Sequence, residues 1–146
     1  MFPARTLDRI EACVSAGERR HDAEIRVVIE ASMDLPDVLR GQGARDRALE
    51  VFGLLRVWDT AANNGVLLYL LLADRAVEVI ADREAAARVD PALWQRVCGQ
   101  VGDALVSSDP AAGLVAAIET MNVALEAAFP ATAGDRDELP DRPRIL

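Results

Sequence analysis

The side chains best suited to chemistry in this 146-residue chain are oxygen-bearing residues at the borders of its predicted strands: Glu24, Asp59, Thr60, Asn63, Asn64 and Asp82. Carboxylate, hydroxyl and amide oxygens are the ligands that hard cations prefer, so we expect Ca²⁺ or Mg²⁺ at this position. The predicted metal ligands are Asp59, Asn64, Asp82 and Glu24. They would come from separate loops, because the sequence has no Asp-x-Asp-x-Asp-Gly run of the EF-hand type.

A predicted hairpin brings part of this set together. The run VLLYLLL at 66–72 is continuously apolar and has turn residues on both sides, which is typical of a strand covered on both faces. A second run, at 77–81, follows after only four residues, so we expect the two to pair as antiparallel strands. The end of the second strand then lies beside the start of the first, which places Asp82 near Asn64.

An earlier strand supplies Glu24. Residues 25–30 alternate, with apolar side chains on one face and Arg26 and Glu30 on the other, so we expect a half-covered strand nearer the sheet edge than 66–72. A helix is predicted over 45–57. A strand, a helix and a second strand imply parallel pairing of the two strands. The starts of both strands and the end of the hairpin therefore meet at one end of the sheet.

The opposite end of the sheet is a rival location. It gathers Ser32, Asp34 and Asp74, which follow the carboxyl ends of the two parallel strands. Ligands of open α/β sheets usually bind beyond the carboxyl ends of parallel strands. We therefore keep Asp34 and Asp74 as an alternative ligand pair.

The remaining segments predict a three-layer α/β/α sandwich with a short mixed sheet, similar to Rossmann-like folds. Helices are predicted over 6–18, with Thr6 as its cap and Gly17 as its end, and after Asp90-Pro91 and Asp109-Pro110, where an N-cap precedes proline. Residues 34–43 read as a loop. We expect one domain over 1–130 and an extended acidic tail over 131–146, which lies on the domain through Leu139, Ile145 and Leu146.

Composition narrows the classes of partner. The net charge is −8, and an acidic chain is a poor ligand for nucleic acid or an anionic membrane. The first residues lack the apolar core of a signal peptide, and we find no run of about 18 apolar residues that would span a membrane. We therefore expect a cytoplasmic protein. The two cysteines predict packed thiols, and His21 predicts an exposed polar residue.

Familiar catalytic motifs are missing from the sequence. It has no Gly-x-Ser-x-Gly nucleophile motif, no phosphate-binding Gly-x-x-x-x-Gly-Lys-[Ser/Thr] loop and no Cys-x₅-Arg loop. We therefore expect no organic cofactor. One histidine is too few for a histidine-rich zinc site.

Several short motifs resemble the TPM domain family, which is named for a plant thylakoid lumen protein, a photosystem II repair protein and a nematode receptor modulator. The motifs are HDAEI at 21–25, NGVL at 64–67, ADR at 73–75 and again at 81–83, Trp94, and the tail DELPDRPRIL. The chain resembles the short, unanchored bacterial branch over about 20–146. The resemblance implies an α/β/α sandwich, divalent-metal binding and an acid-phosphatase activity.

Two functions follow as alternatives. The first is a divalent-metal-binding interaction or regulatory module, with a protein partner that is itself membrane-associated. The second is a weak metal-assisted phosphatase, with Asp59 or Asp82 as base. Phosphoryl transfer gathers negative charge and usually needs Arg or Lys as well as a metal, and the predicted site has few of these, so the first alternative is favoured.

Overall fold

Two parallel strands form the centre of the sheet in the computed structural model, which describes residues 2–133 and 138–146. These are β1 (Glu24–Glu30) and β2 (Gly65–Leu71), paired in register from Glu24 opposite Gly65 to Glu30 opposite Leu71. β3 (Ala76–Ala81) pairs with β2 in the antiparallel direction, which confirms the predicted hairpin. A short β4 (Arg144–Ile145) pairs with the other edge of β1, so the order is β3-β2-β1-β4.

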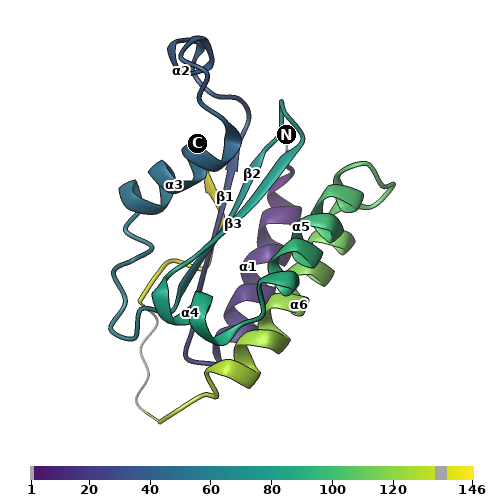
Figure 1. Ribbon diagram of the computed structural model, residues 1–146. Coiled ribbons are helices and arrows are strands. Elements are labelled where there is room, and N and C mark those ends of the chain that lie inside the picture. Colours follow the sequence, from purple (N-terminus) through teal and green to yellow (C-terminus); the bar gives the residue numbers. More distant parts are fainter. Residues whose placement is uncertain (1, 134–137) are drawn as a thin grey trace.

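Helices cover both faces of this sheet (Figure 1). On one face lie α1 (Ala4–Glu18), α5 (Pro91–Leu105) and α6 (Pro110–Ala128), and on the other lies α3 (Ala44–Leu54). Alternate residues of each strand enter two separate hydrophobic cores, so that Ile25 and Leu68 face the first group of helices while Val28 and Tyr69 face α3. The α/β/α sandwich with a mixed sheet is confirmed. Two short helices, α2 (Leu35–Leu39) and α4 (Arg83–Arg88), were not predicted.

Capping explains where the long helices begin. Asp90 accepts a hydrogen bond from the Ala92 N–H, and Asp109 does the same for Ala112, as the Asp-Pro pairs predicted. The prediction for α1 was wrong at its start, because α1 begins at Ala4 after Pro3 and Thr6 lies inside it. The helix ends at Glu18, the last residue of the predicted range and one residue beyond Gly17.

β1 is covered more completely than its alternating pattern predicted. Every residue of the strand is buried, and Arg26 and Glu30 are each only 7% exposed. Arg26 is covered by the C-terminal segment, because its Nη1 donates to the carbonyl oxygen of Arg142 at 2.8 Å. β1 is therefore an interior strand, and the prediction of a half-covered strand was wrong.

α6 is long and apolar enough, by length and composition alone, to cross a membrane, which the sequence analysis did not anticipate. Core helices of soluble proteins pass the same test. Here α6 packs between α1 and α5 and buries side chains such as Leu114, Ile118 and Leu125. Its apolar character is accounted for by these contacts.

The predicted tail over 131–146 is only partly within the described residues, because 134–137 lie outside them. Within residues 138–146, β4 pairs with β1, and Leu139 is buried at 6% exposure. Ile145 and Leu146 are 52% and 38% exposed. These two residues therefore dock through their backbone more than through their side chains, since the Leu146 N–H donates to the Ile29 carbonyl oxygen at 2.9 Å.

Candidate metal-binding site

The backbone brings three of the four predicted ligands to one end of the sheet. Glu24 opens β1, and its N–H donates to the carbonyl oxygen of Asn64 at 3.4 Å. Asp82 follows β3, and its N–H donates to the carbonyl oxygen of Gly65 at 2.9 Å. The hairpin and the parallel pairing thus place Glu24, Asn64 and Asp82 as neighbours along the sheet end.

The side chains of Asn64 and Asp82 both form hydrogen bonds that support the local structure. The Asn64 side chain is buried at 1% exposure and its Nδ2 donates to the carbonyl oxygen of Asp22 at 2.9 Å. Asp82 caps α4, because its Oδ1 accepts from the Arg83 N–H at 2.8 Å. The second oxygen of each group, Asn64 Oδ1 and Asp82 Oδ2, is buried without a hydrogen bond from any described residue. These two oxygens are free to accept a further ligand.

Two backbone features shape the loop before β2. Asn63 adopts a φ of 53°, in the left-handed region that asparagine tolerates better than most residues. Gly65 lies so close to the preceding loop that an added Cβ would be 2.1 Å from the carbonyl oxygen of Val57. The Asn63-Asn64-Gly65 sequence is therefore required by the path of the chain, whether or not it also binds a ligand.

The other predicted ligands lie at the surface. Asp59 is exposed, and its carboxylate forms an ion pair with Arg56 at 3.0 Å. At the rival end of the sheet, Asp34 and Asp74 are both exposed, one before α2 and the other in the turn between β2 and β3. The assignment of metal ligands at either end remains a prediction.

An acidic pocket lies beside Glu24 and was not predicted as a unit. It is a hollow of about 340 Å³ between the end of α1, the start of β1, the segment after α6 and the C-terminal segment. Four of its lining residues are acidic. The lining consists of Ser15, Glu18, Arg19, Asp22, Glu24, Ala131, Thr132 and Asp141.

Three carboxyl groups meet within this pocket. Glu18, Glu24 and Asp141 line the same hollow. Burial, followed by the charge of Glu24, raises the pKa of Glu18 well above its ordinary value. Carboxylates gathered in one hollow repel one another unless one of them holds a proton or a cation lies between them.

The backbone holds two of these carboxyls in place. Glu18 Oε2 accepts from the Ile25 N–H at 3.1 Å, and Glu24 Oε1 accepts from the Glu138 N–H at 2.7 Å. Their remaining oxygens, Glu18 Oε1 and Glu24 Oε2, are buried. Both side chains are thus anchored by one oxygen.

The residue types that line the pocket suit a hard cation, but their present positions do not form a metal site. Every polar lining residue except Arg19 supplies oxygen, as Ca²⁺ and Mg²⁺ require. Over residues 2–133 and 138–146, however, no group of three or more His, Cys, Asp or Glu side chains is already arranged to hold a metal ion. A bound cation would therefore require side-chain movements, together with hydroxyl, backbone or water oxygens.

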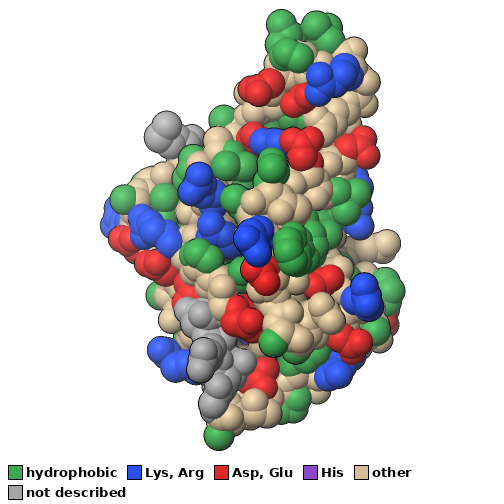
Figure 2. All heavy atoms as spheres, turned by 90° about the vertical axis from the view of Figure 1, so that its left-hand side faces the viewer, with side chains coloured by type: hydrophobic (Ala, Val, Ile, Leu, Met, Phe, Trp, Pro, Cys, Tyr) green, Lys and Arg blue, Asp and Glu red, His purple; other side chains and the backbone are tan. Residues whose placement is uncertain are grey.

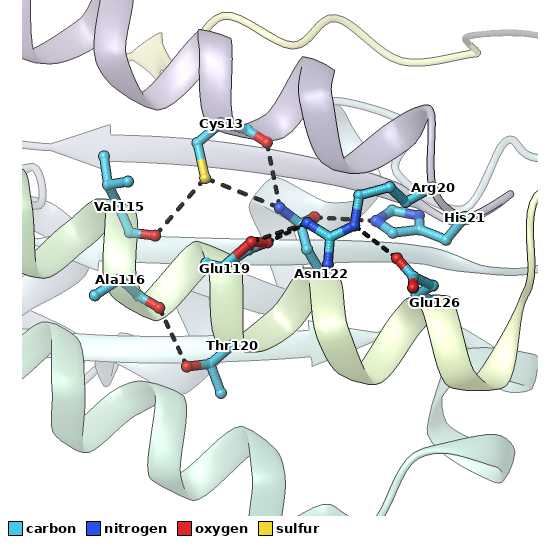
Figure 3. A network of polar contacts seen from close by, with 9 residues as sticks. All are labelled: Cys13, Arg20, His21, Val115, Ala116, Glu119, Thr120, Asn122 and Glu126. Atoms are coloured by element: carbon cyan, nitrogen blue, oxygen red, sulfur yellow. Dashed lines mark hydrogen bonds and ion pairs between the residues drawn. The ribbon is translucent and has the colours of Figure 1, made fainter.

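His21 directly precedes Asp22 in the chain and is buried, so the prediction of an exposed histidine was wrong. Its Nδ1 lies 3.1 Å from the carbonyl oxygen of Ala23. Its Nε2 lies 3.0 Å from Asn122 Oδ1 (Figure 3). Burial lowers the pKa of His21, although both contacts act in the opposite direction. Gly17 makes room for this arrangement, because an added Cβ would lie 2.0 Å from Asn122 Oδ1.

Ion pairs near this histidine join the turn after α1 to α6. Arg20 pairs with Glu119 and Glu126 of α6, and Asn122 also donates to the carbonyl oxygen of Cys13 at 3.2 Å (Figure 3). This network fixes the chain immediately before Asp22 and Glu24, and so fixes one wall of the acidic pocket. A structural role accounts for all of its contacts.

A second group of buried charges lies at the far end of β1. Arg47 donates to both oxygens of Glu30, at 2.8 and 2.9 Å, and the Tyr69 hydroxyl donates to Glu30 Oε1 at 2.6 Å. Burial alone would raise the pKa of Glu30, but the hydrogen bonds from Arg47 and Tyr69 outweigh it and lower the pKa. This carboxylate is thus charged and fully partnered within the protein.

Sequence reasoning missed Glu18 and Asp141 for different reasons. Glu18 is the last residue of α1 and is separated from β1 by five residues. This short connection was a signal from which its position near Glu24 could have been predicted. Asp141 lies in a segment without periodicity. No signal in the sequence could have placed it against α1.

Comparisons with known proteins agree with this architecture. The model of the TPM domain family matches residues 1–124 of the chain. The chain is also similar to the NMR structure of the BA42 protein from the psychrophilic bacterium Bizionia argentinensis. The similarity has a TM-score of 0.86 and 26% sequence identity, and it covers 100% of this chain and 96% of that one. A comparison with curated protein sequences finds no match. The chain therefore belongs to the TPM domain family.

Proposed function

We propose that this TPM domain is a divalent-cation-binding interaction or regulatory module that takes Ca²⁺ or Mg²⁺ in the acidic pocket beside β1. The gathering of the Glu18, Glu24 and Asp141 carboxyl groups around one hollow is the observation that carries this proposal. Carboxyl groups held this close repel one another when ionised, and either protons or a cation can relieve the repulsion. A divalent cation relieves this repulsion while all the carboxyl groups stay ionised.

The pocket and the sequence-predicted ligands share one residue, Glu24. Asn64 connects to the pocket as well, because its Nδ2 contacts the backbone of Asp22, which lines it. The proposed ligands are therefore Glu18, Glu24 and Asp141. Ca²⁺ suits an irregular set of this kind better than Mg²⁺, which demands nearly ideal octahedral geometry.

The pocket favours binding over phosphatase activity. Carboxylates dominate its lining, and Arg19 is the one cationic residue among the lining residues that the structure describes. A phosphoryl group would meet net negative charge there, whereas catalysts of phosphoryl transfer concentrate positive charge. A bound metal would supply part of that charge, so hydrolysis of a generic aryl phosphate is the appropriate assay for the alternative.

Exposed apolar side chains support the interaction part of the proposal. α2 presents Leu35 and Leu39 at 68% and 77% exposure, and the α3 side presents Leu54 and Trp58 at 66% and 46%. Figure 2 shows hydrophobic side chains at the projecting tip formed by α2 and on the face below it. Exposed apolar groups gathered in this way are typical of protein contact surfaces. A protein partner, membrane-associated or not, would bind here.

Thermal unfolding with and without CaCl₂, after treatment with a chelator, tests the cation site. A ligand that binds only the folded protein raises stability by about 2.7 kcal/mol at 100 times its dissociation constant. We expect a rise in Tm for the wild type that is lost in Glu18→Gln and retained in Asp103→Asn, a control on the exposed surface of α5. No rise at millimolar Ca²⁺ or Mg²⁺ would refute the proposal.

Two further variants locate the site. Asp59→Asn combined with Asp82→Asn removes two of the ligands predicted from sequence. Asp34→Asn combined with Asp74→Asn removes the rival end. If only the second pair abolished the rise in Tm, the site would lie at the opposite end of the sheet.

A further inference from the structure

The segment between β1 and α3 carries a short helix with no buried residue. Residues 32–43, here termed the α2 arm, project beyond the end of the sheet (Figure 1). Leu35, Val38 and Leu39 are all exposed, and their spacing places them on one face of α2. A helix this short is not stable in water by itself. A partner that covers its apolar face would therefore stabilise it.

An apolar groove lies on the side of the sheet that is covered by α1, α5 and α6. It consists of two hollows of about 330 and 540 Å³, which share Leu72 and Leu105 in their linings. Val106 lines the larger hollow and is 68% exposed, so part of this apolar surface is in contact with water. We term this feature the Leu72 groove. Its apolar lining includes Phe2, Leu72, Leu105, Val106, Pro110 and Ala111.

The α2 arm and the Leu72 groove lie at the same end of the sheet but on opposite sides of it. The two chain segments leave the sheet as neighbours, because the Ala73 N–H, directly after Leu72, donates to the carbonyl oxygen of Ala31 at 2.9 Å. The arm then leads to α3 on one face, whereas helices of the other face form the groove (Figure 1). The hairpin of β2 and β3 thus separates the arm from the groove of its own chain.

A second copy of the chain can bring an arm and a groove together. A two-fold axis beyond this end of the sheet would place the α2 arm of each copy over the Leu72 groove of the other. Such a contact is reciprocal, so both arms and both grooves are covered in a single closed dimer.

The charges of the two surfaces are complementary. Asp34 directly precedes α2, and its side chain does not cap the helix, whereas Arg75 lines the larger hollow of the groove. Among the ion pairs formed by the described residues, none involves Asp34 or Arg75. Arg40 at the other end of α2 and Asp109 in the smaller hollow form a second opposite pair, although both already have exposed ion pairs. An arm in the groove would therefore gain opposite charges at its ends.

We propose that two copies of this chain associate by exchange of their α2 arms, so that the apolar face of each α2 docks in the Leu72 groove of the other copy with Asp34 beside Arg75. The inference rests on the interaction part of the proposed function, for which it names the partner of α2, and it is independent of the cation site. Interfaces that bury less than about 1,200 Å² belong to weak complexes, and a short arm buries little area. We therefore expect a dissociation constant in the micromolar range.

A lipid surface is a less suitable occupant for the arm. Asp34 and Asp37 lie beside the apolar face of α2, and the chain carries a net charge of −8. Insertion of the arm into lipid would bring these carboxylates out of water, which is costly. Anionic lipids would in addition repel an acidic chain.

Sedimentation equilibrium of the full chain in buffer with a chelator tests the association. Between micromolar and millimolar concentrations we expect the weight-average mass to rise from that of one chain towards that of two. Leu39→Ser removes an apolar contact twice in each dimer and should weaken association at least about tenfold. Val123→Ser changes an exposed apolar side chain of α6 and should leave association unchanged.

Charge reversal tests the pairing of arm with groove and does not depend on the folding of Leu39→Ser. Asp34→Arg and Arg75→Glu should each weaken self-association, because each places like charges in both contacts of the dimer. An equimolar mixture of the two variants should restore association, since every contact of the mixed dimer again joins opposite charges. Arg96→Glu, on the exposed surface of α5, is the control and should change nothing.

Each outcome supports or overturns the exchange of arms. A mass that stays that of one chain at every concentration would overturn it, even if Ca²⁺ raised the Tm. A dimer that Leu39→Ser leaves unchanged, or that the mixture of charge variants does not restore, would also overturn it. Binding of a monomeric chain to neutral phospholipid vesicles, lost in Leu39→Ser, would assign α2 to a lipid surface instead. Restored association in the mixture would support it whether or not a cation binds, so the two proposals can fail separately.

Discussion

Two glutamates at opposite ends of β1 show how differently one fold treats the same residue type. Glu24 opens the strand and Glu30 closes it, and they are 1% and 7% exposed. Glu30 meets Arg47 and Tyr69, which donate three hydrogen bonds to its two oxygens. Glu24 instead lines a hollow together with the acidic residues Glu18 and Asp141. One end of the strand pairs acid with base, and the other pairs acid with acid.

The comparison distinguishes a buried carboxylate with a structural role from one that could bind a ligand. A buried carboxylate with a bidentate arginine has its charge and hydrogen bonds satisfied within the chain, so nothing further need bind. A carboxyl group buried beside other carboxyl groups holds a proton or attracts a cation. The sign of the neighbouring groups, more than burial or residue type, therefore distinguishes the end of β1 that is satisfied within the chain from the end where we propose that a cation binds.

The largest expected effect comes from removing the positive charge of Arg47 beside Glu30. Arg47→Met would leave Glu30 buried without its partner, and loss of one member of a buried pair costs about 3 kcal/mol of unfolding free energy. Urea denaturation measures it. Arg40→Met is the control, because Arg40 is 69% exposed and its pair with Asp37 should contribute less than about 1 kcal/mol. Equal losses in the two variants would contradict a buried, structural pair.

A smaller loss is expected from the hydroxyl group at the same end. Tyr69 is fully buried, and Tyr69→Phe removes one hydrogen bond to the Glu30 carboxylate while it keeps the ring. We expect a loss of about 1.5 kcal/mol, the lower range for hydrogen bonds to charged groups. An unchanged midpoint in urea would show that Glu30 is held by Arg47 alone.

The acidic end should respond in the opposite direction. Because the pKa of Glu18 is raised, the folded protein binds more protons than the unfolded chain above the ordinary carboxyl range, so this group lowers stability as pH rises. We expect Glu18→Gln to stabilise the metal-free protein by about 1 kcal/mol at pH 8. The gain should shrink towards pH 5.

His21 complicates the pH profile and requires a matched comparison. Its pKa is lowered by burial, so its contribution to stability is lost as pH falls below its ordinary value. The difference between wild type and Glu18→Gln cancels this effect, because His21 is present in both. A variant less stable than the wild type at pH 8 would contradict the account of the acidic end.

Local patterns in the sequence were sufficient to predict the hairpin, the parallel pairing and both Asp-Pro caps. They placed Glu24, Asn64 and Asp82 at one end of the sheet, because strand direction follows from the order and spacing of the runs. The short helices α2 and α4 were missed, since five or six residues carry too little periodicity. These successes and omissions both concern neighbours along the chain.

Long-range contacts account for the remaining errors. Arg26 and His21 read as exposed because polar residues usually are, yet Arg26 is covered by the C-terminal segment and His21 by α6. Glu18 and Asp141 are 123 positions apart by residue number (141 minus 18). Their place in one pocket depends on how the C-terminal segment returns across the sheet edge, which no periodic pattern specifies.

The central claim is that the acidic pocket exchanges a proton for a divalent cation, and calorimetric titration with CaCl₂ tests it most directly. Titrations at pH 7 in buffers of different ionisation enthalpy count the protons released on binding. The account predicts release of about one proton per Ca²⁺ bound, since the ligands must be deprotonated, and the release should be absent in Glu18→Gln. Two results would contradict the account. One is Ca²⁺ binding that releases no proton and is retained in Glu18→Gln, and the other is no binding at all.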